Sequence, residues 1–337
     1  MTQATYALDE LNKEARMGQL GVEKVADGDA IPKISLRDFD ARRAEITDQL
    51  WAAATEVGFF QLVDHGLPQE QIDEAFAWSA RFFDLPREVK EKTPLRKADN
   101  VGWEFSSQVR PSVGVPDQKE SYQITKPRMD GLWPAEEDLP GFRAFMDGFE
   151  TRCWEVAMQV LSCFADRLGF ERDFFAAAHD PSSPEYQSTL RLVHYFPLTE
   201  EQVAAPGLWR AGAHTDFDCL TLLFQREGQH GLQVCPGRDL DAPEWTPVPP
   251  GDDAITCNIG DMLMRWSDDQ LLSNFHRVRS PLPGEYTGAR YSIPFFAQAN
   301  RDVVIRTPQG KYEPITAHDY LWQRITANYG TRREPTA

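Results

Sequence analysis

A histidine and an aspartate stand two residues apart in the segment AGAHTDFDCLTLLFQ, residues 211–225. In a β-strand, side chains two apart share a face at a spacing of roughly 6 to 7 Å. If this segment is a strand, His214 and Asp216 could both reach one small object between them. An imidazole and a carboxylate on one face suit a metal ion, a catalytic dyad or a local hydrogen bond. The pair alone favours none of the three.

A second histidine, His276, lies later in the chain within the strand-like segment NFHRV. Two histidines and one carboxylate form the facial triad of non-haem Fe(II) oxygenases, which leaves coordination positions open for a chelating co-substrate and for O2. Catalytic zinc uses the same types of ligand and is an alternative metal. A Ser-His-Asp hydrolase is disfavoured because the sequence contains no GxSxG motif.

An arginine and a serine are also two residues apart in RYSIPFF, which follows His276. A guanidinium fork beside a hydroxyl, as Arg290 and Ser292 would provide, is suited to hold a carboxylate. A keto acid bound to the metal by one end could be held here by its distal carboxylate. A surface arginine and a strand serine are the alternative for each residue taken alone.

The order of these segments resembles a known family. HTD, NFHRVRSP and RYSIPFF resemble the HxD…H…RxS signature of Fe(II)/2-oxoglutarate-dependent dioxygenases, and other phrases resemble the isopenicillin N synthase-like branch, namely GFFQLVDHG, FFDLPREVK, KESYQI, GLQV and IGDMLMRWSDD. The resemblance covers most of the chain. It implies an enzyme that hydroxylates, desaturates or cyclises a small metabolite, with succinate and CO2 as co-products.

The resemblance also implies roles for individual residues. Fe(II) would be bound by His214, Asp216 and His276, and 2-oxoglutarate and O2 would be the co-substrates. The distal carboxylate of 2-oxoglutarate would be bound by Arg290 and Ser292. Our candidate for a further contact to 2-oxoglutarate is Tyr195 in LRLVHYFP. The family often has this tyrosine directly before a proline, whereas here Phe196 separates Tyr195 from Pro197.

The period of a strand gives candidates for substrate binding. If Tyr195 points inward, Arg191 does so too, and if Arg290 and Ser292 point inward, so does Phe296. We expect Arg191 to pair with an acidic or carbonyl group of the substrate and Phe296 to stack on a flat one. The alternatives are a buried scaffold ion pair for Arg191 and plain core packing for Phe296.

Two further residues are candidates for the substrate side. Phe217 directly follows Asp216, and Arg110 lies in the Pro-containing segment SSQVRPSVG. Core packing is the alternative for Phe217, and a solvated surface position is the alternative for Arg110. We interpret three other residues as structural: His65, His194 and Cys219.

The elements that must position these residues change in character near residue 186. Beyond it, short apolar runs with period two alternate with Gly, Pro and Asp turns, in LRLVHYFP, LTLLFQ, GLQVCP, AITCNI, MLMRW, NFHRV and RYSIPFF. A final helix is expected in AHDYLWQRITANYG. Many short strands flanked by helices predict a mainly β fold whose core is a double-stranded β-helix, or jelly roll.

The N-terminal part is expected to be richer in helices. Its pattern indicates an arm or helix over 1–30, a strand over 31–36, a helix from Ala41, a strand over 58–66, a helix from about Pro68, a loop-rich segment over 95–135 and a long helix that stops at Gly169. We therefore assign residues 1–185 to a helix-rich lobe with the first core strands and residues 186–337 to the jelly-roll region, within one structural domain.

Composition excludes some classes of partner. The chain has 337 residues and a formal net charge of −17, which argues against nucleic acid and anionic membranes as partners. The five cysteines form no CxxC pair, the N-terminus has no apolar signal-like core, and no apolar run reaches the roughly 20 residues of a membrane span. We expect a soluble cytoplasmic protein with a small-molecule substrate, and the oligomeric state stays open.

Two other functions stay open at this point. Non-haem iron oxidases and cyclases that do not use 2-oxoglutarate also keep the RxS motif, so this motif does not separate them from the dioxygenases. A metal-dependent ligand-binding protein without turnover could use the same fold. The identity of the substrate does not follow from the sequence.

Overall fold

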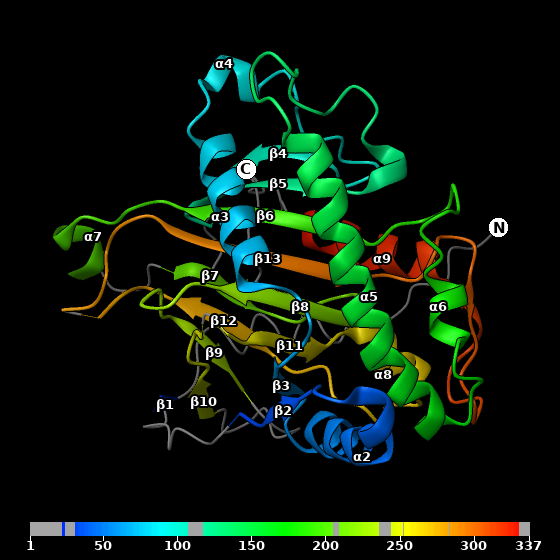
Figure 1. Ribbon diagram of the computed structural model, residues 1–337. Coiled ribbons are helices and arrows are strands. Elements are labelled where there is room, and N and C mark those ends of the chain that lie inside the picture. The colour runs from blue at the N-terminus through cyan, green and yellow to red at the C-terminus, as the bar shows by residue number, and fades with distance from the viewer. Residues whose placement is uncertain are drawn as a thin grey trace, which may run out of the picture.

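The computed structural model describes residues 22–23, 31–106, 117–204, 209–235, 244–251, 253–282 and 284–329. Two β-sheets dominate this part of the chain (Figure 1). The larger sheet contains β2 (Lys33–Ser35), β3 (Phe59–Val63), β4 (Gly102–Phe105), β5 (Lys119–Ile124), β6 (Thr189–Tyr195), β8 (Leu220–Gln225), β11 (Ile255–Ile259) and β13 (Arg290–Ala297). The smaller sheet contains β1 (Val22–Glu23), β7 (Trp209–His214), β9 (Leu232–Val234), β10 (Glu244–Pro247) and β12 (His276–Arg279).

The strand order differs from the order along the chain in both sheets. The larger sheet runs β2-β3-β11-β8-β13-β6-β5-β4 and the smaller one β1-β10-β9-β12-β7, while β14 (Val304–Ile305) and β15 (Ile315–Thr316) form a separate pair. Strands of the central region pair antiparallel, for example β13 with both β6 and β8. This two-sheet architecture with flanking helices confirms the predicted jelly roll.

Helices cover the outer face of the larger sheet. The helices of the described residues are α2 (Phe39–Glu56), α3 (Gln69–Phe83), α4 (Arg87–Lys90), α5 (Phe142–Leu168), α6 (Phe174–Ala178), α7 (Glu200–Ala204), α8 (Asp261–Trp266) and α9 (Ala317–Tyr329), with a 3-10 turn η1 (Lys126–Arg128). Figure 1 shows α3 and α5 crossing in front of β6, β13 and β8. The stop predicted at Gly169 is confirmed, since this residue follows α5 with a φ of 77°, a left-handed conformation that glycine adopts without strain.

Side chains of β8 alternate between the core beneath the helices and the cavity between the two sheets. Leu220, Leu222 and Phe224 belong to the core beneath the helices. Thr221 and Leu223 point the other way and line a cavity between the two sheets. Both faces are buried, because the helices cover one and the smaller sheet covers the other. The strand therefore reads as an almost continuous apolar run.

A second core lies between the two sheets. It joins buried residues of the larger sheet to buried residues of the smaller one, among them Phe59, Val193, Tyr195, Ala211, Leu232, Val234 and Val278. Most of these side chains also line the cavity between the sheets.

One expected element is wrong, and two strands were not predicted. MLMRW, predicted as a strand, belongs to helix α8, in which Met262, Leu263 and Trp266 are buried at a helical spacing. The segment 95–135, predicted as loop-rich, contains β4 and β5. All of β5 is buried, and its charged residues are paired there: Lys119 with Asp117 at 3.4 Å and Glu120 with Lys90 at 3.0 Å. Because this buried strand contains charged residues, apolar periodicity does not predict it.

The expected arm over residues 1–30 lies outside the described residues except for Val22–Glu23, which form β1 and pair with β10. Within the described ranges, none of the helices combines the length and the apolarity needed to span a bilayer.

Candidate active site

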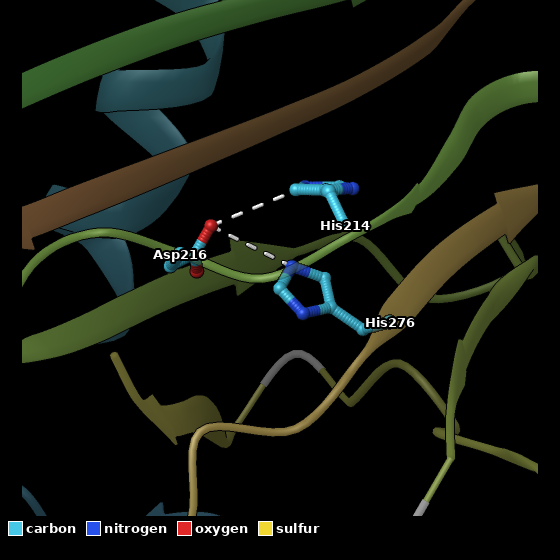
Figure 2. A group of neighbouring side chains, drawn as sticks. All are labelled: His214, Asp216 and His276. Carbon is cyan, nitrogen blue, oxygen red and sulfur yellow. Dashed lines mark ion pairs between the residues drawn. The ribbon is translucent and has the colours of Figure 1, made fainter. Parts of the chain in front are cut away.

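The two histidines and the aspartate come together where the smaller sheet meets the cavity. His214 is the last residue of β7 and His276 the first of β12, and the antiparallel pairing of these strands places the two residues directly opposite each other. The Oδ1 atom of Asp216 lies 4.0 Å from Nε2 of His214 and 3.6 Å from Nε2 of His276 (Figure 2). One ligand atom of each residue lies within 4.8 Å of the others.

His214 and Asp216 do not share one strand. Strand β7 ends at His214, and Asp216 lies in the turn 215–219 before β8. The backbone N–H of Asp261, at the start of α8, donates a hydrogen bond of 2.8 Å to the carbonyl of Asp216. The N-terminus of α8 therefore holds this turn in place.

Backbone carbonyls orient both imidazoles. The Nδ1 atom of His214 lies 2.7 Å from the carbonyl oxygen of Gly212, and Nδ1 of His276 lies 3.3 Å from that of Asn274. A carbonyl only accepts, so Nδ1 donates in these contacts and Nε2 keeps its lone pair for a metal. The residue that follows α2 holds Asn274 in turn, since the side-chain amide of Asn274 donates to the carbonyl of Val57 at 2.5 Å.

Gly58 allows this close approach. It has a φ of 73°, and a Cβ atom at this position would lie 2.6 Å from the carbonyl oxygen of Leu272 and 2.8 Å from Nδ2 of Asn274. A side chain would push the segment that precedes His276 away from β3.

The second oxygen of Asp216 is held by two side chains from the larger sheet. Oδ2 accepts hydrogen bonds from the hydroxyl of Thr221 at 2.6 Å and from the amide of Asn258 at 2.9 Å. Thr221 and Asn258 are direct cross-strand partners on β8 and β11. Burial and the nearby Asp216 raise the pKa of the Asp218 carboxyl well above its usual range. The hydrogen bonds from Thr221 and Asn258 to Oδ2 leave Oδ1 of Asp216 directed at the two imidazoles.

The donor set fits Fe(II). Two imidazole nitrogens and one carboxylate oxygen converge, and each ligand is fixed through its other polar atom, as outer contacts of metal sites usually are. The three side chains come from one end of the smaller sheet and the adjoining turn (Figure 2). The space beside them stays open to the cavity.

The cavity has a volume of about 150 Å³ and adjoins all three residues. Arg290, Ser292 and Tyr195 line it. Arg290 is fully buried, its Nε donates to the carbonyl of Gln229 at 3.2 Å, and its Nη1 has no hydrogen-bond partner among the described residues. Burial lowers the pKa of the Arg290 guanidinium. A buried N–H group without a partner needs an explanation, and a bound carboxylate supplies one.

Three of the substrate candidates line the same cavity: Arg191, Phe217 and Phe296. The guanidinium carbon of Arg191 lies 5.1 Å from the centroid of the Phe296 ring, and its Nε has no hydrogen-bond partner within the described ranges. No carboxylate of the described residues pairs with Arg191, which disfavours a scaffold ion pair. Arg110 lies outside the described residues.

The residues interpreted as structural do not line the cavity. His194 bonds to Glu120 at 2.9 Å and stacks on Tyr291 with 4.8 Å between the ring centroids. Nδ1 of His65 accepts the backbone N–H of Leu67, and Cys219 is fully buried in the core.

Sequence reasoning missed several residues that line the cavity: Asn100, Lys119, Thr189, Asn258, Gln298, Leu321 and Ile325. Thr189 lies two residues before Arg191 on β6, and Gln298 lies two residues after Phe296, just past the end of β13. The two-residue repeat of a strand therefore predicts that both side chains point inward. Lys119 lies opposite Tyr195 on β5, a strand that the sequence did not predict. Leu321 and Ile325 belong to α9, and nothing in the local sequence indicates that this helix borders the cavity.

Comparison with known proteins agrees with this geometry. Residues 31–139 match the family model for the non-haem dioxygenase in morphine synthesis N-terminal region, and residues 186–299 match that for the 2OG-Fe(II) oxygenase superfamily. The chain belongs to the 2OG-Fe(II) oxygenase superfamily. This oxygenase uses Fe(II), 2-oxoglutarate and O2 and acts on a small molecule.

Individual relatives span nearly the whole oxygenase. The proline hydroxylase buaE of Petromyces alliaceus is 36% identical over 318 residues, which cover 87% of this chain and 97% of the relative. The 2-oxoglutarate-dependent dioxygenase frbA of Dothideomycetidae sp. is 35% identical and covers 82% and 88%. A full-length Neurospora crassa protein, solved in complex with alpha-KG and thymine, is 30% identical with a TM-score of 0.79, and the match covers 91% of this chain and 99% of that one.

Proposed function

We propose that the oxygenase binds Fe(II) through His214, Asp216 and His276 and that it hydroxylates a small cyclic metabolite. The observation that carries the assignment is the convergence of one ligand atom from each residue within 4.8 Å, at the wall of a cavity that also contains a buried arginine. Bound there, the iron supplies the O2 chemistry of the reaction. The protein supplies the ligands, their orientation and the enclosure.

We propose that Arg290, Ser292 and Tyr195 hold 2-oxoglutarate. The unsatisfied Nη1 of Arg290 donates to the distal carboxylate, and the Ser292 hydroxyl donates a second hydrogen bond. The ring of Tyr195, 4.8 Å from the guanidinium carbon, keeps the arginine plane in position. Because Arg290 is fully buried, the charge of the carboxylate is compensated away from water.

We propose that the substrate binds against Arg191, Phe217 and Phe296. A substrate carbonyl or carboxylate accepts from the Nε of Arg191, and a flat ring packs against the phenyl groups. Relatives support a small cyclic compound: one is named a proline hydroxylase, and another was solved with thymine. Arg110 stays a proposed substrate-side residue on the basis of the sequence alone.

We also propose a cytoplasmic location, no nucleic-acid or membrane partner, and a single structural domain for 1–185 and 186–337. The location is supported by five buried cysteines without a disulfide, and the absence of polyanion partners by the net charge of −17. The single domain is supported by the larger sheet, in which β2 to β5 and the later strands pair with one another.

The test is an anaerobic titration of the metal-free protein with Fe(II) and then 2-oxoglutarate. We expect a visible metal-to-ligand charge-transfer band in the wild type and no metal binding in His276→Ala. Arg290→Met should bind the metal but form the band only at higher 2-oxoglutarate concentrations. Succinate release with L-proline and thymine as first probes then measures turnover. Iron binding without either a band or succinate would contradict the 2-oxoglutarate assignment and favour a 2-oxoglutarate-independent oxidase.

A further inference from the structure

The C-terminal helix α9 forms part of the cavity wall. Leu321 and Ile325, one helical turn apart, line the cavity together with the metal-site residues. The start of the helix is attached to the β14–β15 region, since the N–H of Ala317 donates to the carbonyl of Val303 at 2.8 Å. Figure 1 shows α9, in red, passing behind α5 in this view.

A single arginine on α9 reaches the segment that carries the metal ligands. Arg324 is buried, and its Nη2 donates to Oδ2 of Asp261 and, at 3.3 Å, to the hydroxyl of Thr215. Its guanidinium carbon also lies 4.9 Å from the centroid of the Phe217 ring. Thr215 and Phe217 flank Asp216, so Arg324 contacts both neighbours of a proposed ligand.

Asp261 connects Arg324 to the two segments that carry the proposed metal ligands Asp216 and His276. Its backbone N–H holds the carbonyl of Asp216, and its Oδ2 accepts from the Thr215 hydroxyl at 3.0 Å. Its Oδ1 accepts from the hydroxyl of Ser273 at 2.6 Å. Ser273 precedes Asn274, whose carbonyl orients His276. The Asp261 carboxylate thus ties the turn of Asp216 to the approach of His276.

Arg324 compensates the charge of this buried carboxylate. Asp261 and Arg324 are both almost inaccessible to solvent. Removing one partner of a buried ion pair leaves the other charged group in a poor environment, so the surrounding structure rearranges. Loss of Arg324 would therefore disturb Asp261, and with it the two segments that Asp261 joins.

We propose that Arg324 is a positioning residue that couples the docking of α9 to the metal site. Docked α9 brings Leu321 and Ile325 to the cavity, and the same contact holds Asp261 in the position that aligns the three metal-binding side chains. Metal binding and helix docking consequently stabilise each other. The inference rests on the proposed assignment of His214, Asp216 and His276 as ligands.

Two measurements on the full chain test the coupling, with Co(II) as the metal because neither requires turnover. In the wild type, Co(II) should slow amide hydrogen exchange over residues 317–325, and this effect should be absent in Arg324→Gln. Reciprocally, Arg324→Gln should bind Co(II) between about 5-fold and 150-fold more weakly, the usual range for coupled sites. Arg324→Lys keeps the charge but lacks the planar fork, so its Co(II) affinity should lie between those of the wild type and Arg324→Gln.

Gln323→Ala on the same helix is the matched control, because Gln323 is not among the residues that line the cavity. Its Co(II) affinity should equal that of the wild type. Unchanged exchange over 317–325 when wild-type protein binds Co(II) would overturn the proposal, and this result needs no variant to fold. Equal Co(II) affinity in wild type and Arg324→Gln would overturn it too.

Failure of the ligand assignment gives a different result. If His276→Ala and Asp216→Ala bind Co(II) as tightly as the wild type, the metal site itself is misassigned, whatever the Arg324 variants do. If those two variants lose Co(II) and Arg324→Gln does not weaken it, the metal site stands and only the coupling is wrong.

Discussion

The guanidinium carbon of Arg290 lies 4.8 Å from the centroid of the Tyr195 ring, and the two residues are direct partners in the antiparallel pairing of β13 with β6. The cross-strand position fixes the arginine before any ligand arrives. Because the guanidinium is buried and one of its N–H groups lacks a partner among the described residues, it is poised for an anionic ligand.

Replacing Arg290 should weaken the binding of 2-oxoglutarate. A hydrogen bond to a charged group contributes roughly 1.5 to 3 kcal/mol, so we expect the KM for 2-oxoglutarate of Arg290→Met to rise by roughly 10-fold to 100-fold. Arg290→Lys should recover only part of the loss because lysine lacks the planar fork. Steady-state succinate formation measures both. Arg226→Gln, at an exposed position, is the control, and a wild-type KM in Arg290→Met would refute the role.

The contacts to Oδ2 of Asp216 should matter for metal affinity. Thr221→Val and Asn258→Ala each remove one donor to this oxygen. Loss of an outer contact of this kind typically weakens metal binding by about 10-fold to 100-fold. Thr221→Ser keeps the hydroxyl and should bind metal nearly as the wild type does. Anaerobic Fe(II) titration gives the affinities, and equal values for Thr221→Val and Thr221→Ser would show that the hydroxyl does not orient Asp216.

Arg191 should act on the substrate and not on 2-oxoglutarate. We expect Arg191→Met to raise the KM for the substrate by roughly 10-fold or more, since a charge-assisted hydrogen bond is lost. The KM for 2-oxoglutarate, and the slow succinate formation without substrate, should stay at wild-type values. A variant that raises both KM values equally would place Arg191 in the general scaffold of the cavity.

Stability should fall in mild acid because of His179, which is fully buried. Burial lowers the pKa of His179 from 6.5 to about 4. Between these values the unfolded state binds a proton that the folded state does not, so the free energy of unfolding decreases as the pH falls from 6.5 towards 4. The full effect is about 3 kcal/mol, from about 1.4 kcal/mol per pKa unit.

Urea unfolding at several pH values measures this effect by comparing wild type with His179→Gln. The variant should be less stable near neutral pH and should lose less stability on acidification. His230→Gln, at an exposed position, serves as the control. Parallel curves for wild type and His179→Gln would contradict the expectation.

The sequence alone predicts which side chains of β6 and β13 face inward. Strand geometry repeats every two residues, so Tyr195 implies Arg191, and Arg290 implies Ser292 and Phe296, without knowledge of any other element. The structure places all five on one cavity. The order of the HTD, NFHRV and RYSIPFF segments likewise indicated the family, because motif order is a property of the chain alone.

Contacts between distant segments were decided only by the tertiary structure. His214 meets His276 because β7 pairs with β12, and Asn258 meets Asp216 because β11 lies beside β8. The burial of Lys119 likewise depends on the pairing of β5 with β4 and β6. Arg324 shows the same limit: its helical segment was predicted, but its contact with Asp261 follows from where α9 docks. Local periodicity reports which face a side chain occupies, whereas strand pairing and helix docking depend on the burial of the whole fold.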